Sequence, residues 1–123
     1  IKKYSTFSEP LVNAIETDVS AYVNFIKNIF SGSNCKIYFF SVPAPVILSK
    51  KLSENDNFQI NVIKTFNEKL CKSVMENYYG YIDTYEITKN KDGYSNMKYH
   101  CDKRHLSPSI LPQICSYIGE AVS

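Results

Sequence analysis

The stretch that decides the fold is IYFFSVPAP, residues 37–45 of a 123-residue chain. Its first part is apolar and rich in aromatic residues, and it lies between Gly32 and two prolines. An apolar run this short, bounded by glycine and proline, is typical of a strand buried on both faces. We therefore predict a central strand over residues 36–42 that leaves into a proline-rich loop.

Two amphipathic helices are predicted on either side of this strand. Apolar residues recur every three or four positions from about residue 10 to 30, and again from about 55 to 77. That spacing is the period of a helix with one buried face. Ser8 can cap the first helix, Pro10 is tolerated in its first turn, and Gly32 should end it.

A second strand is predicted over residues 81–85, YIDTY. Because a helix joins it to the first strand, the two should run parallel in a βαβ crossover. Residues 86–104 are polar and are predicted to form a long irregular loop, a kind of segment that is often functional.

A last helix is predicted after Ser107 and Pro108. Pro112 should distort its first turns or move its start to a later residue. The predicted apolar face of this helix consists of Ile110, Ile114, Ile118 and Ala121.

Composition indicates one globular α/β unit over residues 1–123, with 44% hydrophobic residues, 10 Tyr and 7 Phe. A net charge of +2 gives no signal for a nucleic-acid partner. No apolar run approaches the roughly 18 residues that a membrane span needs. Two strands do not make an independent sheet, so we expect further strands from elsewhere. The predicted fold is the C-terminal part of a three-layer α/β domain with a parallel sheet.

The cysteines match no zinc-binding spacing, and buried free thiols are favoured over disulfides. They are Cys35, Cys71, Cys101 and Cys115. A metal site would need His100, Cys101 and His105, and a fourth ligand is not evident. No metal and no cofactor are therefore predicted.

The candidate site is the segment CDKRHLSP, residues 101–108, in which Asp102 precedes His105 by three positions. Histidine can take and return a proton near neutral pH, and a neighbouring carboxylate can fix its tautomer and stabilise the imidazolium. Such a pair also occurs in capped turns, so its spacing alone is weak evidence. A nucleophile is missing, because Ser33 lies in a turn between a helix and a strand.

The final block Asp102-x-x-His105, its Leu106-Ser107 continuation and the order of elements before it resemble the C-terminal half of the SGNH (GDSL-type) hydrolase family. The resemblance implies a flavodoxin-like sheet and a serine ester hydrolase or O-acyltransferase, with acylated carbohydrate as one substrate class. His105 would be the general base and Asp102 the residue that orients it. The nucleophile and oxyanion hole would come from an N-terminal part that this chain lacks, so the chain alone should be inactive.

Two other functions fit the same residues. One is a non-catalytic binding or structural module that keeps the fold. The other is a small secreted effector or capsid-associated domain stapled by two disulfides.

Several polar residues near the predicted strand ends have both structural and functional interpretations. Asp83 could touch a substrate, but capping the next turn is favoured. Tyr85, Tyr94 and Tyr99 could stack on a sugar ring, although surface tyrosines are also ordinary.

Overall fold

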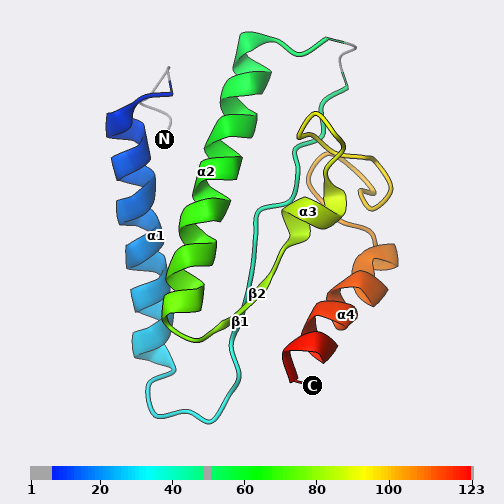
Figure 1. Ribbon diagram of the computed structural model, residues 1–123. Coiled ribbons are helices and arrows are strands. Elements are labelled where there is room, and N and C mark those ends of the chain that lie inside the picture. The colour runs from blue at the N-terminus through cyan, green and yellow to red at the C-terminus, as the bar shows by residue number, and fades with distance from the viewer. Residues whose placement is uncertain (1–6, 49–50, 123) are drawn as a thin grey trace.

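The computed structural model describes residues 7–48 and 51–122 and shows a mixed α/β chain (Figure 1). Its elements are α1 (Glu9–Ile29), β1 (Tyr38–Phe40), α2 (Glu54–Glu76), β2 (Gly80–Ile82), α3 (Thr84–Thr88), a 3₁₀ turn (Pro108–Ile110) and α4 (Leu111–Val122). The two strands form a parallel sheet in which Phe39 is opposite Tyr81. The predicted βαβ crossover is therefore confirmed.

The core lies between the sheet and the two long helices. α1 and α2 run side by side on one side of the strands, and α4 lies on the other side (Figure 1). α1 contributes one residue per turn to this core, and Phe39 of β1 packs among them. The buried residues of this core cluster are Leu11, Ile15, Val19, Val23, Phe39, Val62, Leu70 and Val74.

The predicted helices are confirmed, with bounds within a few residues. α2 begins at a capping box, because the Ser53 hydroxyl accepts the Asp56 N–H and the Asp56 carboxylate accepts the Ser53 N–H. Ser8 occupies the cap position of α1, but its side chain makes no capping hydrogen bond.

The first strand is shorter than predicted, and the second strand ends three residues earlier than predicted. β2 ends at Ile82, and Tyr85 belongs to α3. The cause is Asp83, whose carboxylate accepts the Glu86 N–H and starts a helix. Apolar and polar residues alternate in YIDTY as they do in a strand, but the strand ends at Ile82 and Asp83 caps the helix that follows.

α3 also takes up the first part of the segment predicted as a loop, so the irregular stretch begins only after Thr88. α4 starts where the sequence suggested, after a 3₁₀ turn capped by the Ser107 hydroxyl. Its predicted apolar face is covered only in part. Ile110 is buried, Ile114 is half-buried, and Ile118 is 37% exposed. The side chain of Ala121 lies outside the described residues.

Gly80 is the one position in the sheet where a side chain would not fit. A Cβ atom there would meet the ring of Tyr38, its partner in the neighbouring strand. The two strands can approach in this register because residue 80 is glycine.

Candidate functional site

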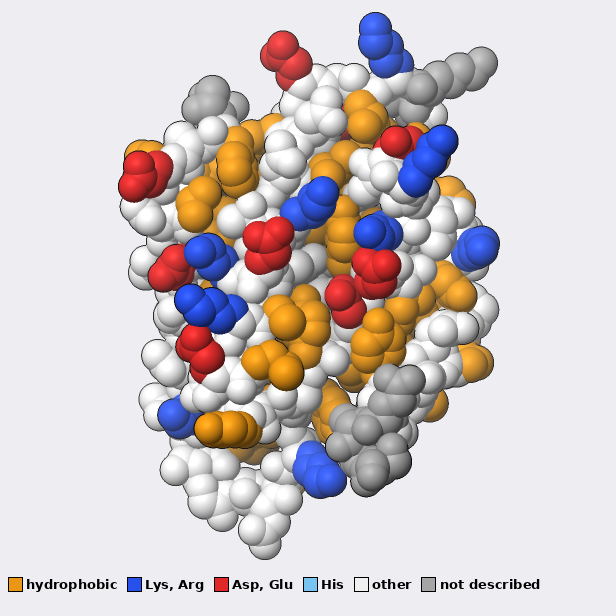
Figure 2. Space-filling model, in the orientation of Figure 1, with side chains coloured by type: hydrophobic (Ala, Val, Ile, Leu, Met, Phe, Trp, Pro, Cys, Tyr) orange, Lys and Arg blue, Asp and Glu red, His pale blue; other side chains and the backbone are white. Residues whose placement is uncertain are grey.

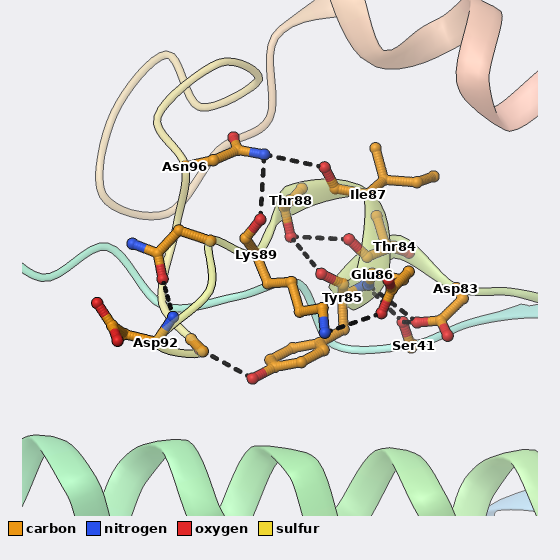
Figure 3. Close-up of polar contacts among 12 residues, drawn as sticks. Ser41, Asp83, Thr84, Tyr85, Glu86, Ile87, Thr88, Lys89, Asp92 and Asn96 are labelled. Atoms are coloured by element: carbon orange, nitrogen blue, oxygen red, sulfur yellow. Dashed lines mark hydrogen bonds and ion pairs between the residues drawn. The ribbon is translucent and has the colours of Figure 1, made fainter.

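The carboxyl ends of β1 and β2 are joined by buried hydroxyl groups. The Ser41 hydroxyl donates to the Asp83 carboxylate at 3.2 Å and accepts the Tyr85 N–H at 2.8 Å (Figure 3). The same carboxylate oxygen of Asp83 accepts the Glu86 N–H at 3.1 Å. The capping interpretation of Asp83 is thus confirmed.

The proline-rich exit of β1 is held by side chains from two helices. The Asn67 amide of α2 pairs with both backbone groups of Val42, at 2.8 and 3.0 Å. The Thr88 hydroxyl of α3 accepts the Ala44 N–H at 2.9 Å and donates to the Thr84 carbonyl at 2.7 Å. Asn67 and Thr88 are buried, so these contacts are shielded from water. They fix the path of the chain as it leaves the sheet.

The long loop is attached to this exit. The Ser95 N–H donates to the Pro45 carbonyl at 2.8 Å, and the Asn96 N–H donates to the Thr88 carbonyl at 2.7 Å. The Asn96 amide also donates to the carbonyls of Ile87 and Lys89 (Figure 3). These bonds place the start of the loop at the carboxyl edge of the sheet.

Beyond that attachment the loop forms a hairpin-like stem. The Ser107 N–H donates to the Tyr99 carbonyl at 2.6 Å, His100 and Leu106 form an antiparallel bridge, and the Cys101 N–H donates to the His105 carbonyl at 3.0 Å. Asp102 and His105 sit at the tip that this stem closes.

The two predicted site residues are in contact. His105 Nδ1 lies 2.9 Å from Asp102 Oδ2 and 3.0 Å from Oδ1. Asp102 Oδ1 also accepts the backbone N–H groups of Arg104 at 2.7 Å and His105 at 2.8 Å. The side chains of His105 and Asp102 are 72% and 57% exposed. The pair is therefore formed within one turn and faces solvent.

The charge on Asp102 defines the proton position on His105. The Arg104 N–H and then the His105 side chain lower the pKa of Asp102 to about 2. An ionised carboxylate only accepts hydrogen bonds, so His105 Nδ1 carries a proton, and in the neutral imidazole Nε2 is then the nitrogen with the lone pair. Among the described residues, no hydrogen bond engages Nε2. The contact therefore occupies Nδ1 and leaves Nε2 without a partner among the described residues.

The tyrosines considered for sugar stacking and the serine considered as a nucleophile differ in their surroundings. Tyr85 is buried, and its hydroxyl donates to the Gly93 carbonyl at 2.9 Å, so stacking on a sugar is wrong for this residue. Tyr94 and Tyr99 are half-buried, and their stacking stays a prediction. The Ser33 hydroxyl accepts the Cys35 N–H at 3.0 Å within a turn.

All four cysteines are free thiols. Burial was the wrong prediction for Cys35, Cys101 and Cys115, which are exposed. Cys71 is half-buried, and burial raises its thiol pKa. Within residues 7–48 and 51–122, no cluster of three or more metal-ligating side chains occurs.

A hollow of about 540 Å³ lies between α2 and α3, away from the Asp102–His105 pair. Its lining includes lysines and carboxylates of α2, of α3 and of the residues that flank α3, together with Tyr81. Figure 2 shows basic and acidic side chains interspersed with hydrophobic ones over this face of the molecule. The lining therefore offers no single sign of charge to a ligand.

The sequence did not indicate a contact between Ser95 and His100. Ser95 Oγ lies 2.7 Å from His100 Nδ1, and Ser95 is 3% exposed. The two residues are five positions apart in a loop without regular structure, so no periodic pattern reveals the contact.

Within the described part of the chain, none of the helices has both the length and the apolar character needed to cross a membrane. No protein-family model, curated protein or solved structure matches this chain.

Proposed function

We propose that this chain is the C-terminal part of an SGNH-type serine ester hydrolase or O-acyltransferase. The observation that carries the proposal is the 2.9 Å contact between His105 Nδ1 and the Asp102 carboxylate, with Nε2 left unbonded among the described residues. Acylated carbohydrate is proposed as a substrate class on the strength of the family resemblance alone.

The proposed reaction uses His105 first as a base and then as an acid. A serine hydroxyl from another part of the polypeptide gives its proton to His105 Nε2 as its oxygen attacks the ester carbonyl. The imidazolium then protonates the leaving alcohol, and an acyl-enzyme remains. Water, or a sugar hydroxyl in a transferase, repeats the sequence to release the acyl group. Asp102 stays ionised throughout and stabilises the imidazolium.

The outer edge of β1 supports the proposal that the sheet is larger. Toward β2 the ladder uses the Ile37 carbonyl and the Ser41 N–H. Backbone groups alternate in direction along a parallel strand, so those of Tyr38 and Phe40 point to the opposite edge. No described residue pairs with that edge. A further parallel strand there would extend the sheet toward the proposed flavodoxin-like, three-layer arrangement.

Exposed apolar side chains of β1 and α1 also support further structure around this chain. Phe40 is 53% exposed although it lies in the sheet, and Phe25 on α1 is 62% exposed. Tyr22 and Ile29 lie on α1 at helical spacing from Phe25 and are also exposed. Large exposed apolar groups favour burial against further structure.

The experiment is covalent labelling of the polypeptide that contains this chain and its preceding segment, using a fluorophosphonate ester probe. We expect one serine outside residues 1–123 to be labelled, and we expect His105→Ala to abolish the labelling. A matched control is Ser109→Ala, which changes an exposed hydroxyl close to the pair and should leave labelling intact.

Absence of any labelled serine would contradict the proposal and favour a binding module that retains the fold. Labelling that survives His105→Ala would also contradict it, because the serine would then be activated by another base.

A further inference from the structure

We propose that His100 is a positioning residue that holds the Asp102–His105 pair in its working geometry through a hydrogen bond to buried Ser95. The catalytic benefit of this positioning rests on the proposed function. The positioning itself, that is, the effect of the Ser95–His100 hydrogen bond on His105, can be tested on this chain alone.

The Asp102–His105 pair does not anchor itself to the body of the protein. Both side chains are more than half exposed, and the partners that Asp102 binds all lie within residues 102–105. An exposed ion pair of this kind contributes little to order by itself. The direction of His105 Nε2 therefore depends on how the stem below the tip is fixed.

The stem has a side-chain tie at its base. His100 lies in the bridge to Leu106, and its Nδ1 is 2.7 Å from Ser95 Oγ. The N–H of Ser95 is bonded to the Pro45 carbonyl, and Ser95 is almost fully buried. The contact thus links the stem to the exit of β1, where buried side chains hold the chain.

The donor and acceptor in this contact can be assigned. Ser95 is almost fully buried and its hydroxyl, which accepts the Met97 N–H at 3.0 Å, has no other acceptor than His100 Nδ1 among the described residues, so donation to Nδ1 leaves the hydroxyl proton bonded. His100 then accepts at Nδ1 and carries its proton at Nε2. Burial lowers the pKa of His100, while the negative charge of Asp102 opposes this shift. The neutral, accepting form is therefore favoured near pH 7.

The test compares three variants of this chain by nitrogen NMR of the imidazoles and by hydrogen exchange. His100→Phe keeps a ring but removes the acceptor, and Ser95→Ala removes the donor. His100→Asn retains an acceptor oxygen where Nδ1 stood. His105 serves as the reporter, because the chain has only 2 histidines.

In His100→Phe and Ser95→Ala we expect the nitrogen chemical shifts of the His105 ring to move toward the values of an imidazole that populates both tautomers. The Ser107 amide, which closes the stem, should exchange roughly five times faster, as expected for the loss of one hydrogen bond of about 1 kcal/mol. His100→Asn should restore both readouts. A general loss of stability would also speed hydrogen exchange at the core amides of α2. A positioning effect would leave the exchange rates of those amides unchanged.

The proposal is overturned if His105 keeps its native tautomer and Ser107 its native exchange rate in both disruptive variants. It is equally overturned if His100→Asn behaves like His100→Phe. Neither result bears on whether a serine elsewhere in the polypeptide is labelled, so failure of this inference and failure of the proposed function are distinguishable.

Discussion

Asp102→Asn is expected to lower kcat for ester hydrolysis by roughly 10³–10⁴-fold in the polypeptide that contains the proposed nucleophile. The amide has no charge to stabilise the imidazolium that forms when the serine is deprotonated. Its NH₂ group can also donate to His105 Nδ1, which moves the imidazole proton to Nε2 and removes the base. The measurement is the rate of p-nitrophenyl acetate hydrolysis under saturating substrate.

Asp92→Asn is the matched control for this experiment. Asp92 is an exposed aspartate of the same loop, so its substitution removes the same charge. We expect the control to retain nearly full activity. Comparable rates for Asp102→Asn and the control would show that Asp102 caps a turn and has no part in catalysis.

Leu70→Ala should cause the largest loss of folding stability, about 2–5 kcal/mol of the free energy of unfolding. Leu70 is 1% exposed and belongs to the core cluster that joins α1, α2 and the sheet. Truncation removes apolar contacts from both helices and leaves a cavity. Urea unfolding followed by circular dichroism measures the effect, and Leu70→Met gives a milder variant if the alanine protein does not fold.

Met75→Ala is the control on the same helix, because Met75 is 59% exposed. Its effect should stay within about 0.5 kcal/mol of zero. Similar losses for the two variants would mean that this face of α2 is not the buried one.

The long helices could be predicted because their apolar period extends over several turns. Leu11, Ile15 and Val19 repeat at four-residue intervals and are all buried. The β1 strand could be predicted from its short apolar run and its prolines. Parallel pairing then followed from the length of the helical connection.

Residues 81–85 could not be assigned in the same way, because the local cap at Asp83 is completed by a residue that is distant in the chain. Asp83 starts α3 with help from Ser41, which is 42 positions away and accepts the Tyr85 N–H. A propensity for strand in YIDTY is outweighed by these buried polar contacts.

In the candidate site, too, one part could be predicted from the sequence and the other could not. Asp102 and His105 pair within one turn, so their spacing alone predicted the contact. The stem that presents them depends on Ser95, Pro45 and Thr88, which come from separate segments of the chain. No spacing rule connects such residues.

The central claim is that Asp102 holds His105 as a base with Nε2 free. The most direct measurement is a long-range nitrogen–proton correlation spectrum of this chain, at a pH where both imidazoles are neutral. We predict the Nδ1–H tautomer for His105, the Nε2–H tautomer for His100, and loss of the His105 preference in Asp102→Asn. An Nε2–H tautomer at His105 in the native chain would contradict the account, because the nitrogen needed to accept the serine proton would already carry one.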